Sequence, residues 1–245
     1  MKENNLRLGV NIDHIATVRN ARKGDFPCLI RALKILKSSN VDSVTVHLRE
    51  DRRHINDNDL KNLKEINLLP INLEMAATKE MQEICVNLKP FACCIVPEKR
   101  KELTTEGGLD VKNQIKYLKD ILKPILASNI RVSLFVDPDV EQILAAKKLN
   151  VNAVEIHTGR YADAFKRNKF LDELEKIKIS VNYCKSLGLE CHAGHALDLK
   201  NVSKIANIQG LKELNIGHYI VSESIYSGLS NTIKKLKETI ELASK

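Results

Sequence analysis

Short apolar runs with strand character alternate with helical periodicity along the whole chain. The strand-like runs lie near residues 6–13, 42–48, 70–75, 91–96, 130–136, 152–157, 189–193 and 212–217. Between them, apolar residues recur at spacings of three and four, the period of an amphipathic helix, as in 111–125 and 170–184. Eight strand–helix units in 245 residues predict an α/β fold, a single (β/α)8 TIM barrel. We expect one catalytic domain over residues 1–245, with extra helical and loop elements.

An open, doubly wound α/β sheet is the alternative arrangement of the same units. Its dinucleotide-binding form carries a GxGxxG turn after the first strand, and no such turn follows residues 6–13. After the fifth run, Asp137 and Pro138 predict the start of a helix, with Asp137 as its N-cap.

Aliphatic and polar side chains alternate within the strand-like runs. In the first run, Leu8, Val10 and Ile12 share one face, because successive side chains of a strand point to opposite faces. The opposite face of this and later runs carries Asn11, Asp13, Thr45, His47, Arg49, Asn72, Glu74, Glu155, His157 and Asn215. We expect this polar face to point into the barrel lumen. Since unpaired polar burial is costly, a polar lumen predicts an active site at the carboxyl ends of the strands.

The chain's seven histidines all stand at the end of a strand-like run or shortly beyond it, and we expect none of them inside a helix. They are His14, His47, His54, His157, His192, His195 and His218. Histidine changes charge near neutral pH, so this placement predicts proton transfer in one reaction chamber. His192-x-x-His195 could instead be half of a metal site, but it lacks a carboxylate-rich companion set.

Polar motifs follow the first two runs and carry Asn11, Asp13, His14 and Arg22, then His47, Arg49 and His54. Guanidinium groups suit phosphate, and a lumen-facing His47 is placed to move protons. A turn with solvated charges is the alternative for both motifs. It is the preferred interpretation for the neighbouring residues 50–52.

Later strand ends carry three further candidate features. Glu74 ends the third run, where burial would raise the pKa of its carboxyl and suit it to acid–base catalysis; a salt bridge to an arginine is a compatible alternative. Residues 97–110 form a long polar segment with paired glycines, either a lid or a plain surface loop. Gly194-His195 and Gly217-His218 stand where TIM barrels commonly bind phosphate through backbone N–H groups.

Composition narrows the class of partner. With 43% hydrophobic and 29% charged residues, the chain resembles an ordinary soluble protein, and its net charge of +8 suggests anionic partners. Nucleic acid is a weaker option, because the chain has no Trp and few aromatics. No apolar run is long enough for a signal core or a membrane span. The six cysteines include no CxxC pair and are expected to be buried in a protein of the reducing cytoplasm.

These observations predict a metal-independent barrel enzyme that performs acid–base chemistry on a phosphorylated small molecule. The chain also contains the strings GVNIDHIATVRNAR, TVHLREDRRHI, NLEMA, CCIVPEKRKELTTEGGLDV, VSLFVD, EIHTGRYA and ELNIGH. In this order they resemble the motifs of the pyridoxine 5′-phosphate synthase family, from about residue 6 to about residue 240. The resemblance implies a TIM barrel that assembles as a homo-octamer built from dimers and needs neither a metal nor an organic cofactor.

The resemblance also implies the reaction and the roles of individual residues. The family condenses 3-amino-2-oxopropyl phosphate with 1-deoxy-D-xylulose 5-phosphate to give pyridoxine 5′-phosphate, phosphate and water. Its pattern makes His47 and Glu74 proton acceptors, His195 the proton donor and Glu155 a transition-state stabiliser. It assigns the aminoketone phosphate to Asn11, Arg22, Ala196, Gly217 and His218. It assigns the deoxyxylulose phosphate to Asp13, His14, Arg49, His54 and Thr104.

The chain departs from the family pattern at two positions. Ala196 stands where a glycine is frequent, and a backbone N–H contact there is expected to need a negative φ. Glu223 stands where some relatives carry arginine. Two other functions remain open: a metal-dependent sugar-phosphate epimerase or isomerase, and a non-catalytic barrel that binds anions or RNA.

Overall fold

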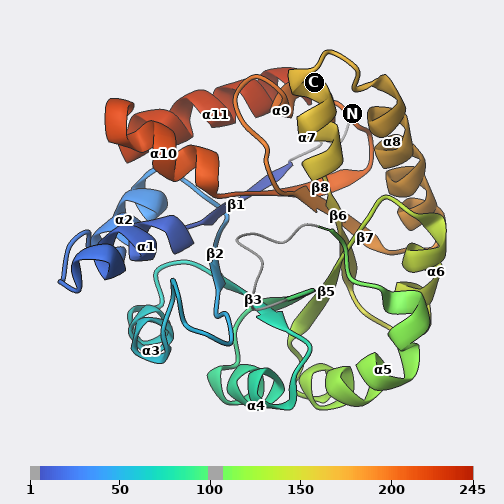
Figure 1. Cartoon of the computed structure of the whole chain (residues 1–245), viewed down its shortest axis with the longest axis horizontal. Helices are drawn as coiled ribbons and strands as arrows, with labels where there is room; N and C mark the ends of the chain where they lie inside the picture. Colours follow the sequence, from blue (N-terminus) through green and yellow to red (C-terminus); the bar gives the residue numbers. More distant parts are fainter. Residues whose placement is uncertain (1–5, 99–106, 245) are drawn as a thin grey trace.

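The strands close into a parallel barrel, because β1 pairs with β2 on one side and with β8 on the other (Figure 1). The computed structural model describes residues 6–98 and 107–244. The strands are β1 (Arg7–Asn11), β2 (Ser43–His47), β3 (Ile71–Ala76), β4 (Ala92–Val96), β5 (Arg131–Val136), β6 (Ala153–His157), β7 (Glu190–Gly194) and β8 (Leu211–Ile216). The predicted TIM barrel is therefore confirmed, and the open sheet is wrong because no strand of this sheet is left at an edge.

Helices surround the barrel and lie outside the strands (Figure 1). They are α1 (Asp13–Arg22), α2 (Leu29–Ser38), α3 (Asp57–Ile66), α4 (Lys79–Leu88), α5 (Val111–Ala127), α6 (Val140–Lys148), α7 (Gly159–Lys166), α8 (Leu171–Ser186), α9 (Val202–Ala206), α10 (His218–Ser227) and α11 (Leu229–Ala243). Within the described ranges, no helix is both long and apolar enough to cross a membrane.

Two histidines lie inside helices, contrary to expectation. His14 is in the first turn of α1 and His218 begins α10. The reason is that single residues, Ile12 and Gly217, separate these helices from β1 and β8. Short connections therefore place the first turns of both helices at the carboxyl ends of the strands.

The predicted alternation of faces is observed. Val10 and Ile12 are fully buried between the barrel and the helices, while Thr45, Glu155 and Asn215 are buried in the lumen. These lumen groups are hydrogen-bonded to one another. The Thr45 hydroxyl donates to Asn215 Oδ1 at 3.2 Å, and Asn215 Nδ2 donates to Glu155 Oε2 at 2.8 Å. This pairing offsets much of the cost of burying polar side chains.

One predicted helix start lies two residues too early. Helix α6 begins at Val140, and the Asp139 side chain caps it by accepting a hydrogen bond from the Glu141 N–H at 2.8 Å. Asp137, the predicted cap, directly follows β5 and bonds elsewhere. The cysteine prediction also needs one correction: Cys28 is exposed just before α2, while the other five cysteines are buried.

Gly9 provides a test of how tightly the lumen is packed. A Cβ on Gly9 would lie 2.1 Å from Asn215 Oδ1 and 2.9 Å from Ser43 Oγ. Asn215 cannot turn away without losing its bonds to Thr45 and Glu155. We therefore expect Gly9→Ala to lower the free energy of unfolding by about 1–3 kcal/mol in a urea titration. Gly24→Ala is the control, because its Cβ would meet only the Arg22 carbonyl oxygen at 4.0 Å. Equal stability of the two variants would contradict the packing argument.

Candidate active site

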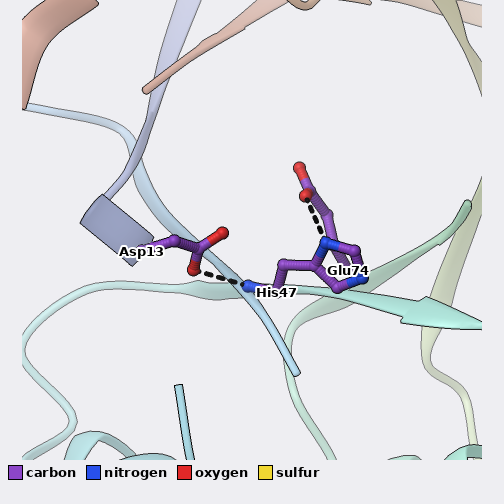
Figure 2. Close-up of side chains that lie close together, drawn as sticks. All are labelled: Asp13, His47 and Glu74. Atoms are coloured by element: carbon purple, nitrogen blue, oxygen red, sulfur yellow. Dashed lines mark hydrogen bonds and ion pairs between the residues drawn. The ribbon is translucent and has the colours of Figure 1, made fainter. Parts of the chain in front are cut away.

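Three predicted residues meet at the carboxyl ends of β1, β2 and β3 (Figure 2). Asp13 Oδ1 accepts a hydrogen bond from the His47 backbone N–H, and Asp13 Oδ2 accepts one from Asn11 Nδ2, both at 2.8 Å. His47 and Glu74 are register partners on β2 and β3, and His47 Nδ1 lies 3.8 Å from Glu74 Oε2. The imidazole and the carboxyl group thus face each other, and a small movement of either side chain would bring them within hydrogen-bond distance.

Burial determines the protonation of these carboxyl groups. It is the main reason that the pKa of Glu74 is raised well above its usual value, and the nearby carboxylates of Asp13 and Glu155 add to the effect. Burial also raises the pKa of Asp13, against the opposing influence of His47 and Arg49. A carboxyl group that keeps its proton closer to neutral pH is suited to general acid–base catalysis.

Glu98 is a member of this group that the sequence reasoning missed. Its side chain is 1% exposed, and its Oε2 lies 3.4 Å from His47 Nε2. Its Oε1 lies 3.7 Å from Arg49 Nε and accepts a hydrogen bond from the Glu50 N–H at 2.9 Å. Burial alone would raise the pKa of Glu98, but contacts with His47, Glu50 and Arg49 lower it. His47 therefore lies between a carboxyl group that tends to hold a proton and a carboxylate.

The signal for Glu98 was present in the sequence. The period of two that puts Cys94 in the lumen continues past the end of β4 to residue 98. Composition alone places Glu98 in the polar segment 97–110. The remainder of that segment from 99 to 106, including Thr104, lies outside the described residues, so its role as a lid stays a prediction.

The remaining histidines of the first two motifs pack together with His218. The ring centroid of His14 is 5.7 Å from that of His54 and 4.8 Å from that of His218. His54 Nδ1 shares a hydrogen bond with the Thr17 hydroxyl at 2.7 Å. Burial and neighbouring positive charges lower the pKa of His54 to about 4, and burial with His218 also lowers that of His14. Both rings are thus neutral at pH 7, able to donate and to accept hydrogen bonds.

Gly217 allows the β8–α10 connection to come close to β1. A Cβ on Gly217 would lie 2.8 Å from the Asn11 Cβ. Glycine is therefore required by the close approach of backbone and side chain. The N-terminus of α10 and the Asn11 amide are brought side by side, an arrangement that suits an anionic group.

His195 and Ala196 form a turn directly after β7, with φ angles of 85° and 58°. Hydrogen bonds donated to the carbonyl groups of the turn hold it in place. The Thr158 hydroxyl donates to the oxygens of Gly194 and His195 at 2.7 and 2.6 Å, and Asn201 Nδ2 donates to that of Ala196 at 3.2 Å. The negative φ on which a backbone N–H contact at Ala196 is expected to depend is therefore not observed. Alanine here adopts the left-handed conformation that glycine adopts easily, at a cost of about 1–2 kcal/mol.

Glu155 lies deeper in the lumen, below this turn. Burial raises the pKa of Glu155 to about 7, against the influence of His192 and the hydrogen bonds that it accepts from Asn215 and Cys94. A Cβ on Gly194 would lie 2.4 Å from Glu155 Oε1, so the glycine makes room for the carboxyl group. Burial, reinforced by the charge of His157, lowers the pKa of His195 to about 4.

Arg22 does not join these residues. It lies exposed in the last turn of α1, away from the buried cluster of Asp13 and His47. The prediction that it binds a substrate phosphate therefore has no contact in the described part of the chain to support it.

The Asp13–His47–Glu74 cluster could also accept a cation. Each side chain offers one ligand atom, and these atoms lie within 4.8 Å of one another. Two carboxylates and an imidazole form a donor set that divalent metals use. The expectation of a metal-free enzyme stays a prediction that chelation must test.

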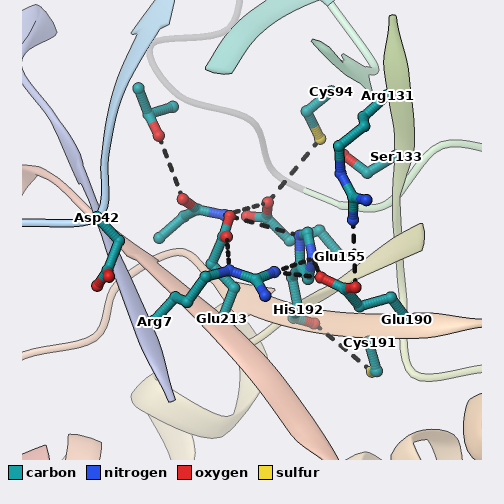
Figure 3. Close-up of polar contacts among 12 residues, drawn as sticks. Arg7, Asp42, Cys94, Arg131, Ser133, Glu155, Glu190, Cys191, His192 and Glu213 are labelled. Atoms are coloured by element: carbon teal, nitrogen blue, oxygen red, sulfur yellow. Dashed lines mark hydrogen bonds and ion pairs between the residues drawn. The ribbon is translucent and has the colours of Figure 1, made fainter. Parts of the chain in front are cut away.

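His192 faces the cavity at the amino-terminal half of the barrel (Figure 3). Its contact with Glu213 continues through Asn215 to Glu155. His192 Nε2 lies 2.9 Å from Glu190 Oε1, and Arg131 Nη2 donates to Glu190 Oε2 at 3.2 Å. Arg7 Nε donates to Glu213 Oε2 at 2.8 Å, and Arg7 also pairs with Glu190. These residues border a cavity of about 270 Å³. The prediction that all seven histidines share one chamber is therefore wrong for His192, as is the pairing of His192 with His195 in a metal site.

The cavity does not mark the reaction centre. It lies at the amino-terminal ends of the strands, whereas TIM barrels carry out their chemistry at the opposite end. Its arginines and glutamates pair with one another, and Asp42 accepts a hydrogen bond from the Leu8 N–H at 2.8 Å, so these charges have structural roles. The carboxyl ends instead carry the imidazoles of His54 and His195, whose pKa values burial lowers to about 4.

Comparisons with known proteins give the family. The model of the family described as "Pyridoxal phosphate biosynthesis protein PdxJ" matches residues 8–242. The chain belongs to the pyridoxine 5′-phosphate synthase family. Over 238 residues it is 50% identical to the pyridoxine 5′-phosphate synthase of Zymomonas mobilis. This match covers 97% of this chain and 93% of the relative. The corresponding enzyme of Sulfurihydrogenibium sp. is 52% identical over 238 residues, covering 96% and 98% of the two chains. Membership makes the chain an enzyme of vitamin B6 biosynthesis.

Solved structures resemble the chain in fold alone. Thiamine phosphate pyrophosphorylase from Pyrococcus furiosus superposes with a TM-score of 0.60 at 12% identity, covering 99% of both chains. The tryptophan synthase A-subunit of Pyrococcus furiosus gives 0.62 at 10% identity, covering 97% of this chain and 99% of that one. The pyridoxine 5′-phosphate synthase family thus shares its barrel with enzymes of other chemistry.

Ala196 allows the strain in the β7 turn to be measured. Ala196→Gly removes the cost of the left-handed conformation but makes the unfolded chain more flexible. We expect a net gain in the free energy of unfolding of up to about 1 kcal/mol, with kcat/KM kept within about twofold. Ala145→Gly in α6 is the control and should lose about 1 kcal/mol. A loss of stability in Ala196→Gly would contradict the strained conformation.

Proposed function

We propose that this chain condenses 3-amino-2-oxopropyl phosphate with 1-deoxy-D-xylulose 5-phosphate to give pyridoxine 5′-phosphate, phosphate and water. The observation that carries the proposal is His47 between the Glu74 and Glu98 carboxyl groups at the strand ends of a family member. The amine and the ketone that react both belong to the substrates, so no enzyme lysine has to form a Schiff base. The sequence of dehydration, enolisation and ring closure requires repeated proton transfers in one pocket.

His47 and Glu74 act as the proton acceptors. Burial raises the affinity of Glu74 for a proton, so its ionised form can take up a proton from carbon or nitrogen and release it again. The distance of 3.8 Å from Glu74 Oε2 to His47 Nδ1 lets the proton pass on to the imidazole after a small movement. Glu98, on the other side of the ring, then stabilises the imidazolium that forms.

His195 acts as the proton donor and Glu155 stabilises the positive charge that develops during condensation. With a pKa of about 4, His195 is neutral in the unliganded protein. A substrate phosphate beside it would favour the imidazolium, because an opposite charge stabilises the charged form. Substrate binding would thereby charge the donor. Glu155, whose pKa is about 7, can serve as a carboxylate at neutral pH.

Two sets of residues hold the two phosphorylated substrates. The aminoketone phosphate is bound by Asn11, Arg22, Ala196, Gly217 and His218. The deoxyxylulose phosphate is bound by Asp13, His14, Arg49, His54 and Thr104. The two sets meet between β1 and α10, where the ring centroids of His14 and His218 are 4.8 Å apart, so the two substrates would be held next to each other. Arg22 can take part only if its side chain leaves the exposed position that it has in the unliganded protein.

We place the enzyme in the cytoplasm, as a homo-octamer built from dimers that binds neither nucleic acid nor membranes. Exposed apolar side chains near α1 and on α10 support association between copies. Phe26 is 80% exposed and Tyr226 is 87% exposed. Such side chains are costly in water and are typical of protein interfaces.

The reaction itself is the test of the proposal. Purified, chelator-treated protein is mixed with both substrates, and pyridoxine 5′-phosphate and phosphate are measured. Product that requires both substrates and survives chelation supports the proposal. Turnover of one sugar phosphate alone with added metal would point to an epimerase or isomerase. Salt-sensitive RNA binding without turnover would point to a non-catalytic barrel.

Variants of the three proton carriers test their roles. We expect His47→Ala, Glu74→Gln and His195→Ala each to lower kcat by roughly 10²–10⁴-fold, because each removes a group that moves a proton. Glu65→Gln is the control, since Glu65 is a surface carboxylate 62% exposed on α3. Circular dichroism confirms the fold of each variant. Near-normal turnover by folded Glu74→Gln would remove Glu74 from the mechanism.

A further inference from the structure

His157 is a buried histidine that the proposed reaction does not use. It is the last residue of β6, 4% exposed, and shares the lumen face with Glu155. Its Nδ1 lies 3.1 Å from Asp137 Oδ1, and Asp137 is the residue that directly follows β5. Two neighbouring strands thus end in a carboxylate–imidazole pair.

The ring of His157 packs directly on the proposed proton donor. The ring centroids of His157 and His195 are 4.8 Å apart, with an angle of 62° between the ring planes. Phe135 closes the other side, with its centroid 5.1 Å from His157 and 6.3 Å from His195. The His195 ring therefore has an edge-to-face neighbour that fixes its orientation.

The charge of Asp137 determines which ring nitrogen of His157 carries the proton. The hydrogen bond from His157 lowers the pKa of Asp137, and a backbone hydrogen bond from Gly108 lowers it further. An ionised carboxylate only accepts hydrogen bonds, so His157 Nδ1 must carry the proton. In the neutral ring, Nε2 then carries the lone pair. Nε2 is buried and has no hydrogen-bond partner among the described residues.

Gly159 shows that the space around both rings is restricted. A Cβ on Gly159 would lie 2.5 Å from His157 Nε2 and 3.1 Å from His195 Cδ2. The glycine at the start of α7 is therefore the residue that lets the two rings converge. Between them, Thr158 holds the His195 carbonyl by its hydroxyl. Residues 157–159 thus support both the backbone and the ring of His195.

We propose that Asp137 and His157 are a positioning pair for His195, which fixes the ring of the proton donor and the side from which it can deliver its proton. Asp137 holds His157 by Nδ1, and His157 holds His195 by ring packing. The pair acts through His195, so this inference rests on the role given to His195 in the proposed function. The pair also explains why Asp137 does not cap α6, a role left to Asp139.

A double-mutant cycle tests the proposal. His157→Phe keeps a ring for packing but loses the bond to Asp137, and Asp137→Asn removes the charge that selects the His157 proton. We expect each to lower kcat about 10–100-fold, the loss typical when the partner that orients a working imidazole is removed, with KM changed less than about threefold. In the His195→Ala background, the same changes should lower kcat by less than about twofold, because the ring through which the pair acts has been removed.

The outcomes separate this inference from the proposed function. Equal losses in both backgrounds would overturn the pair's action through His195, as would an unchanged kcat in the single variants. An unchanged kcat in His195→Ala alone would instead overturn the role of His195. Asp139→Asn is the matched control, an aspartate two residues away whose cap an asparagine can keep. If His157→Phe fails to fold, the cycle is measured with Asp137→Asn and His195→Ala alone.

A second readout does not depend on turnover. The charged groups that face the two rings are Asp137 at the end of β5 and Arg160 and Asp163 on α7. Because the charge of His157 helps to lower the pKa of His195, His157→Phe should raise the pH at which the His195 ring titrates in NMR spectra. An unmoved His195 titration would contradict direct contact between the rings.

Discussion

Burial of carboxyl groups inside a closed barrel is the constraint on which this active site depends. The parallel strands leave no edge, so the polar residues that alternate along them can only face the lumen. There burial raises the pKa of Glu74 and of Glu155, while hydrogen bonds and positive neighbours lower that of Glu98. One small volume thus holds carboxyl groups that differ in their affinity for protons. This is the arrangement by which enzymes obtain acids and bases from the same residue type.

The same constraint explains where glycine is required. Gly9, Gly159 and Gly194 each stand where a Cβ would collide with a polar lumen side chain or an imidazole ring. A lumen filled with branched apolar residues would need no such gaps. The missing Cβ atoms at these points leave room for Asn215, for the two imidazole rings and for the Glu155 carboxyl group. The base of the barrel solves the problem differently, by pairing arginines with glutamates.

Much of the site could be predicted because the alternation of side chains between the two faces of a strand can be read from neighbouring residues alone. Knowing that alternate residues face the lumen is enough to select His47, Glu74 and Glu155 from the sequence. A position near the end of a run does not give height along the barrel axis: His192 is the middle residue of β7, and its ring contacts Glu190 and Glu213 on the amino-terminal side. The alternation of side chains also cannot show contacts between strands, which is why the pairing of His157 with Asp137 was missed.

Other features were beyond any local rule. The left-handed conformation of Ala196 depends on hydrogen bonds from Thr158 and Asn201, which come from other parts of the chain. Arg22 was selected by its charge and by resemblance, and neither fixes the direction of a long side chain on a surface helix. The barrel itself followed from repetition, since eight similar units have few ways to bury their strands.

Titration of the lumen carboxyl groups tests the central claim most directly. Carbon-13 NMR of glutamate-labelled protein, with Glu74→Gln and Glu155→Gln variants for assignment, gives the protonation of each carboxyl group. The account predicts one resonance with a midpoint near 7 that disappears in Glu155→Gln, and another above the usual range that disappears in Glu74→Gln. If every glutamate instead titrated at or below about 4.3, burial would not control proton affinity in this barrel, and the account would be wrong.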